Sequence, residues 1–170
     1  MEVDDVLTEL IAHSGDRLLR VGYQLTHDRA AAQDLVQEAL LRVYDSVRRR
    51  GRAPEDWYGY LRRAVINEYV RTRRLRASTE VVTDLVPDRP AAGSPEDQIA
   101  DRAQLWGALE ALSPRQRAVL VLRYYEGLDD CEIAAVLGCR EASVRSLASR
   151  GLAVMRQLAA PVSIAEEDRA

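Results

Sequence analysis

The chain has 170 residues, of which 47% are hydrophobic and 30% charged, and its formal net charge at pH 7 is −3. This apolar content excludes a chain that is disordered throughout, and the length suits one ordinary domain or two small ones. The acidic net charge argues against a protein that binds DNA tightly by itself, because such proteins usually carry a basic domain.

Helical periodicity extends over most of the chain and no alternating strand pattern of useful length occurs, so we predict an all-α fold. Aliphatic residues form one stripe over residues 3–11 and another over about 16–25, which predicts two helices. Asp28 is the expected N-cap of a longer helix that ends near Arg49, ahead of Gly51.

A fourth helix is predicted over about residues 56–76. Residues 77–97 contain three prolines, one glycine and five acidic residues against one arginine, which indicates a flexible acidic linker. We therefore predict two small helical domains, residues 1–76 and 98–160, followed by a short acidic tail at 161–170.

In the second domain, residues 113–116 combine a serine N-cap, a proline and a glutamine at capping-box spacing, which predicts the start of a helix that runs to Gly127. The same capping signal at residues 129–132 predicts a short helix that ends at Gly138. A longer helix is expected to follow over about 141–158.

The two helices on either side of Gly138 have the pattern of a helix-turn-helix, which needs a glycine at the turn and buried aliphatic residues on both helices. The residues at the required offsets are Ile133, Ala134, Leu137, Val144 and Leu147. An ordinary helical hairpin with a glycine turn is the alternative. In a helix-turn-helix the second helix enters the DNA major groove, and Arg145 is the side chain that we expect to bond a base or a phosphate there.

Charge is divided unevenly within the first domain. Residues 1–47 hold nine acidic residues and four arginines, whereas residues 48–76 hold ten arginines and three acidic residues. Tryptophan and tyrosine side chains are interleaved with these arginines, and this combination suits a surface that stacks unpaired bases while it holds their backbone. Core packing is the alternative role for Trp57 and Tyr60, and the favoured one for at least one of them, because both also lie on the apolar stripe of their helix.

No pattern of catalytic or metal-binding residues appears. Cys131, Cys139, His13 and His27 do not have metal-ligand spacing, so we expect no metal and no cofactor. An acidic cluster, a nucleophile pair and a phosphate loop are all missing, so we expect neither an enzyme nor a small-molecule substrate. With no run of 18 uncharged apolar residues and an acidic N-terminus, we expect a cytoplasmic protein without membrane insertion.

Three segments together resemble a known family. Residues 25–28, read with the stretch from Asp34 to Tyr44, resemble region 2 of the sigma-70 family of bacterial RNA polymerase sigma factors, in its short extracytoplasmic-function (ECF) type. Residues 60–67 resemble the promoter-melting segment of that family, and residues 112–156 resemble region 4. The resemblance implies a sigma factor that binds core RNA polymerase and directs promoter-specific transcription initiation, with an anti-sigma factor as a further partner.

The resemblance also implies three contact surfaces. Core polymerase would be bound by Asp34, Leu35, Gln37, Glu38 and Leu41. The opened minus-10 strand of promoter DNA would be held by Arg48, Arg49, Arg50, Arg52, Trp57, Tyr60, Arg63, Asn67, Arg71 and Arg74. The minus-35 duplex would be contacted by Arg140, Ser143, Arg145, Ser146, Ser149 and Arg150.

The predicted linker sets a geometric limit. Its 21 residues span at most about 70 Å when extended, but the ends of a free coil of this length average roughly 25 Å apart. The two promoter elements stand on the order of 20 base pairs apart, which at about 3.4 Å per pair is also about 70 Å. We therefore expect core polymerase to hold the two domains apart, and the resemblance implies that the acidic linker lies in a basic channel of the enzyme.

A stand-alone helix-turn-helix regulator with an N-terminal sensing domain is the leading alternative. It explains residues 99–158 equally well, but it does not explain the basic and aromatic segment at residues 48–76.

Overall fold

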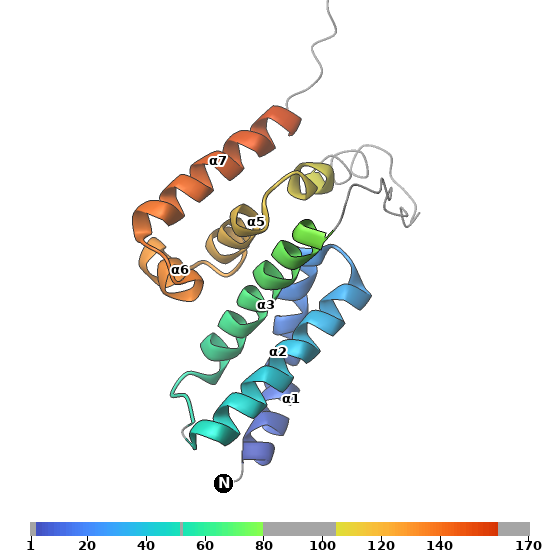
Figure 1. Ribbon diagram of the computed structural model, residues 1–170, viewed down its shortest axis with the longest axis vertical. Coiled ribbons are helices and arrows are strands. Elements are labelled where there is room, and N and C mark those ends of the chain that lie inside the picture. The colour runs from blue at the N-terminus through green and yellow to red at the C-terminus, as the bar shows by residue number, and fades with distance from the viewer. Residues whose placement is uncertain (1–2, 52, 80–104, 160–170) are drawn as a thin grey trace, which may run out of the picture.

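The computed structural model describes residues 3–51, 53–79 and 105–159, and every regular element in these ranges is helical. The N-terminal unit, residues 3–79, consists of α1 (Val3–Thr26), α2 (Arg29–Arg50) and α3 (Trp57–Thr79). The C-terminal unit, residues 105–159, consists of a short helical segment at 105–110, α5 (Pro114–Leu120), the π-helical segment η1 (Val121–Tyr125), α6 (Asp130–Leu137) and α7 (Glu141–Ala159) (Figure 1). The predicted all-α fold class is confirmed.

Residues 3–26 form one helix, α1, whereas the apolar stripes predicted two. Residues 12–15, which separate the two stripes, contain no proline, so each backbone N–H of this stretch remains available to the helix. Leu18, Val21 and Leu25 continue the stripe and are fully buried, and this burial favours a continuous helix.

The predicted boundaries of α2 are confirmed. The Asp28 carboxylate accepts a hydrogen bond from the Ala31 N–H at 2.7 Å, and the helix ends at Gly51, which has a φ of 63°. The next helix, α3, continues to Thr79, three residues beyond the predicted end at Arg76. The rest of the predicted linker and the predicted acidic tail lie outside the described residues.

Both predicted capping boxes of the C-terminal unit are present, at Ser113 with Gln116 and at Asp129 with Glu132. The helix that begins at Pro114 changes at Val121 into a π-helical turn, which accommodates one extra residue per turn. Sequence patterning did not predict this turn. Because of the extra residue, the side chains that follow the turn point in other directions than a regular α-helix would give them.

The helix-turn-helix is confirmed as a structural motif. Gly138 has a φ of 60°, a left-handed conformation that glycine adopts without a steric penalty. Ile133 on α6 and Val144 on α7 are completely buried where the two helices meet. The turn therefore fixes the position of α7 against the rest of the C-terminal unit.

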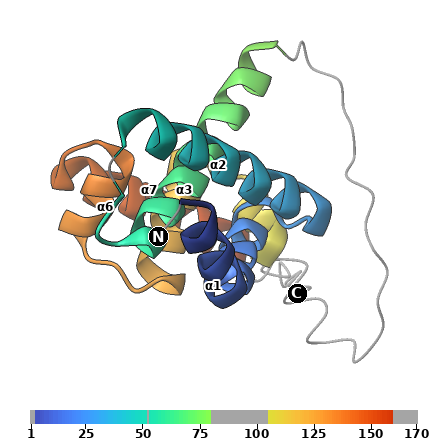
Figure 2. The same cartoon turned by 90° about the horizontal axis from the view of Figure 1, so that it is seen from below.

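The two units pack against each other. One continuous cluster of buried residues includes Leu61 and Val65 from the N-terminal unit and Leu122 and Ile133 from the C-terminal unit. Helix α3 contacts both α5 and α6, and both views show the C-terminal unit alongside α3 (Figures 1 and 2). Although the sequence predicted two domains joined by a linker, it did not indicate this contact.

The glycine at the turn provides a test of the fold. Gly138→Ala is expected to lower the free energy of unfolding by about 1–2 kcal/mol, because a Cβ is strained at positive φ. Gly107 is the matched control: it lies in the helical segment at 105–110 and a Cβ there would meet nothing within 4 Å. Gly107→Ala should leave stability unchanged or raise it by up to about 1 kcal/mol. Urea unfolding measures both, and equal effects of the two variants would contradict this account.

Candidate nucleic-acid interface

The outward face of α7 presents the six side chains predicted to meet minus-35 DNA. Arg140, immediately before the helix, and Ser143, Arg145, Ser146, Ser149 and Arg150 are all exposed. The opposite face of the helix is buried at Val144, Ala148 and Gly151. The packing of α7 therefore leaves the predicted face open to a duplex.

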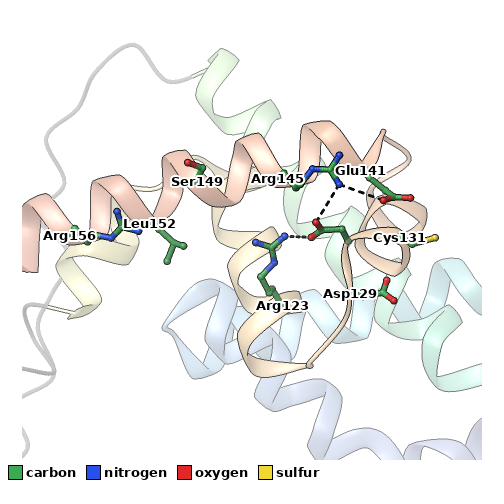
Figure 3. A pocket seen from close by; sticks show the side chains of 9 residues that line it. Arg123, Asp129, Cys131, Glu141, Arg145, Ser149, Leu152 and Arg156 are labelled. Carbon is green, nitrogen blue, oxygen red and sulfur yellow. Dashed lines mark hydrogen bonds and ion pairs between the residues drawn. The ribbon is translucent and has the colours of Figure 1, made fainter.

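Arg145 lies in an open groove between α7 and the start of α6 (Figure 3). Its guanidinium is 3.7 Å from the Asp130 carboxylate and 3.6 Å from the Glu141 carboxylate. The other oxygen of Asp130 accepts a hydrogen bond from Arg123, which anchors this carboxylate in the groove. Exposed ion pairs of this kind contribute only about 0–1 kcal/mol, so Arg145 is readily released to an incoming DNA group.

Asp130 should weaken DNA binding, because its negative charge lies next to the predicted contact residue Arg145. We expect Asp130→Asn to tighten binding to a random-sequence duplex several-fold, since it removes repulsion of the phosphates. Glu9→Gln, at an exposed glutamate of α1 where no DNA contact is predicted, is the matched control and should have no effect. Fluorescence anisotropy at several salt concentrations measures both; an unchanged affinity of the Asp130 variant would show that the groove does not face DNA.

The described residues among those predicted to hold the minus-10 strand lie at the end of α2 and along α3. Arg48, Arg49, Arg50, Arg63, Asn67, Arg71 and Arg74 are exposed. Arg50 and Tyr60 line the same hollow between the end of α2 and the start of α3, so the fold brings these two predicted residues together. The side chain of Arg52 lies outside the described residues.

Trp57 and Tyr60 have mixed environments. Both side chains are half-buried and pack against the core cluster, so the alternative role in core packing applies to each of them in part. Their remaining exposed surface is still available for stacking.

Arg71 is already engaged by a neighbouring carboxylate. It donates hydrogen bonds at 2.6 and 3.1 Å to Glu68, which is 6% exposed and also accepts from Thr72. Arg42 of α2 lies 3.0 Å from the same carboxylate. The hydrogen bonds from Arg71 lower the pKa of Glu68, supported by Thr72 and Arg42 and opposed in part by burial.

This lowered pKa predicts an acid-dependent loss of stability. Because the pKa of Glu68 is lower in the folded chain than its ordinary 4.5, the carboxylate stabilises the fold fully above pH 4.5 and progressively less as the pH falls through the folded value. Glu68→Gln should therefore lower the free energy of unfolding at pH 7 by about 1–3 kcal/mol, and less at pH 3. Glu9→Gln, at an exposed residue, is the control. Chemical unfolding at both pH values measures the effect, and a constant difference would contradict the prediction.

Four of the five residues predicted to grip core polymerase share an exposed face of α2: Asp34, Gln37, Glu38 and Leu41. Leu41 is 55% exposed, which is high for a leucine and suits an apolar contact with a partner. Leu35 does not lie on this face. It is buried in the core beside Val36, because its position on the helix faces inward, so the free chain does not present it on this face.

A polar cluster between the two units was missed by sequence reasoning. The side chain of Glu126, just after η1, is only 2% exposed, yet it is surrounded by charged and polar groups of the N-terminal unit. Tyr58 donates to its carboxylate at 3.0 Å, Arg62 at 3.0 Å and Arg17 at 3.2 Å. Burial, followed by the nearby Glu126 charge, raises the pKa of Tyr58 to about 12. No local signal could reveal these pairs, since the partners are 64 to 109 positions apart in the sequence.

The described ranges hold neither a candidate metal site nor a candidate membrane-spanning helix. No group of three or more His, Cys, Asp and Glu side chains there could hold a metal ion. None of the helices in the same ranges is long and apolar enough to cross a bilayer.

Family models and known proteins match both units. Residues 10–75 match the model of sigma-70 region 2, and residues 102–155 match that of sigma-70 region 4. The RNA polymerase sigma-E factor of Streptomyces coelicolor is 40% identical over 152 residues, which is 88% of this chain and 83% of that protein. The ECF RNA polymerase sigma factor SigL of Mycobacterium tuberculosis is 32% identical over 139 residues, with 76% and 75% covered.

A solved structure supports the fold. It is that of the sigma factor RpoE in complex with the anti-sigma factor NepR from Bartonella quintana, with a TM-score of 0.63 and 24% sequence identity. The match covers 92% of this chain and 97% of that chain.

Proposed function

Because the chain belongs to the ECF type of the sigma-70 family, a family that directs promoter-specific transcription initiation, we propose that its two units read two separate promoter elements. The C-terminal unit docks on the minus-35 duplex, and the N-terminal unit captures the opened minus-10 strand. The observation that carries this proposal is the exposed arginine and serine face of α7 in a helix-turn-helix.

The chemistry of each surface suits the promoter element that it is proposed to bind. On α7, arginines can bond guanine edges or phosphates and serines can bond either, as major-groove readout requires. On the N-terminal unit, Arg50 and Tyr60 lie around one hollow, and Arg63 and Asn67 are exposed further along α3. A basic surface with an aromatic side chain suits single-stranded DNA, whose bases stack while the phosphates pair with arginine.

The exposed face of α2 is the proposed contact with core polymerase. Leu41 would supply the apolar part and Asp34, Gln37 and Glu38 the polar part. Core polymerase then positions both units on the promoter, so that two weak contacts combine into specific binding. An anti-sigma factor is the second proposed protein partner. We propose a non-enzymatic role in the cytoplasm for the chain.

The stand-alone regulator is not favoured. That reading leaves the match of residues 10–75 to sigma-70 region 2 without an explanation.

The proposed contact with polymerase has a matched test. Leu41→Glu places a charge in the apolar part of the α2 face and is expected to reduce co-elution with core polymerase and run-off transcription from a genomic promoter pool by at least about tenfold. Ile11→Glu is the control, because Ile11 is another exposed aliphatic residue, 46% exposed on α1. Equal losses in both variants would indicate a general effect of the added charge. Full activity of the Leu41 variant would disprove the proposed surface.

A further inference from the structure

Arg145 differs from the other exposed arginines of the α7 face in its partners. Its Nη1 atom lies 3.7 Å from the Asp130 carboxylate and 3.6 Å from the Glu141 carboxylate. Within the described residues, Arg140 and Arg150 form no ion pair, and the Nε of Arg150 donates to a backbone carbonyl of α7 at 3.3 Å. Two carboxylates therefore surround Arg145, and its neighbours on the same face keep their full charge.

The Asp130 carboxylate is held in place from its other side. Its Oδ1 accepts a hydrogen bond from Arg123 on η1, whereas its Oδ2 faces Arg145. The Asp130 side chain is only 25% exposed. Glu141 is 52% exposed, and among the residues that the structure describes its carboxylate pairs with Arg145 alone. Asp130 is thus an anchored partner of Arg145, and Glu141 is an unanchored one.

Both ion pairs use the same atom of Arg145. The two carboxylates approach Nη1, and in the described part of the chain neither Nε nor Nη2 has a partner (Figure 3). A guanidinium bonds guanine bidentately through two donors on one edge, and Nε and Nη2 form such an edge. Arg145 can therefore bind a guanine while Nη1 stays next to Asp130.

The two carboxylates make Arg145 better suited to a base than to a phosphate. A phosphate contact depends on positive charge and tolerates many orientations, and the carboxylates reduce this charge locally. A base contact depends on orientation, because both donors must meet O6 and N7 of the guanine together. A side chain that is oriented in advance loses less conformational entropy on binding. Arg145 is also the fifth residue of α7, near the end of the second helix that reaches base edges in a helix-turn-helix.

We propose that Asp130 is a specificity-determining residue that positions Arg145 to read a guanine of the minus-35 duplex, whereas Arg140 and Arg150 bind phosphates. The inference rests on the proposed function, because it concerns how the proposed minus-35 surface selects its sequence. Asp130 itself does not contact DNA and acts through Arg145. Its negative charge weakens binding to every sequence, and in return the chain distinguishes the correct base pair from the others more sharply.

Selection from a DNA pool tests the role of Arg145. Core polymerase loaded with the chain is incubated with a promoter that the parent transcribes, randomised at the minus-35 element, and the bound duplexes are sequenced. The parent should prefer guanine at one base pair by at least about tenfold, as a bidentate contact provides. Arg145→Lys keeps the charge but loses the two-donor edge, so it should abolish the preference at this base pair alone. A weaker recovery of all sequences with every preference intact would show that Arg145 binds a phosphate, and would overturn the proposal.

The same selection tests the role of Asp130. Asp130→Asn should lower the preference for guanine at this base pair by about threefold, or about 0.7 kcal/mol, because a neutral amide no longer pairs with the guanidinium. Glu141→Gln is the matched control, since it removes an equal charge at nearly the same distance from Arg145, but from an unanchored side chain. It should tighten binding to a random-sequence duplex as much as Asp130→Asn does and keep most of the preference. Equal losses of preference in both variants would show that charge alone is responsible, and would overturn the positioning role.

Two further readouts separate positioning from support of the fold. Asp130→Asn should leave the preferences at the other base pairs of the element unchanged, whereas a loosened fold would reduce all of them. Asp130→Glu keeps a carboxylate within reach of Arg145 and should retain more of the preference than Asp130→Asn. A general loss of preference, or an Asp130→Glu variant no better than Asp130→Asn, would contradict the positioning role.

Failure of the proposed function would have a different result. If core polymerase loaded with the parent enriched no sequence at the minus-35 element, the proposed contact with this element would fail, and the role of Asp130 with it. If the parent enriches a sequence and Asp130→Asn leaves every preference unchanged, only the role of Asp130 is overturned.

Discussion

The structure depends on how one buried carboxylate is compensated. Glu126 is almost completely removed from solvent at the contact between the two units, and a lone charge in that position would prevent the contact from forming. Arg17, Tyr58 and Arg62 compensate it from two helices of the other unit, so the polar network fixes how the units face each other. The apolar cluster that runs through both units adds buried area to this contact. The carboxylate sets the relative orientation of the two units, because it has to meet all three of its partners.

Arginine serves two different purposes in this chain. Arg62 and Arg117 face the contact between the units, where their charges are paired with a carboxylate or a carbonyl. Arg63 and Arg145 face solvent, where a phosphate or a base can reach them. Adjacent positions such as 62 and 63 therefore belong to different surfaces, because successive residues of a helix are about 100° apart around its axis. Counting arginines along the segment could not separate the two sets.

Local sequence signals determined the helices, the capping residues Asp28, Ser113 and Asp129, the turn at Gly138 and the exposed face of α7, because each depends on residues only a few positions apart. They also sufficed for the resemblance to the family. The tertiary structure alone decided that α1 is continuous, that Leu35 faces the core, and that the chain turns through a π-helical segment before Glu126. It also decided the contact between the units, since its charges are brought together from positions 64 to 109 residues apart and only the packing of complete helices can select such partners.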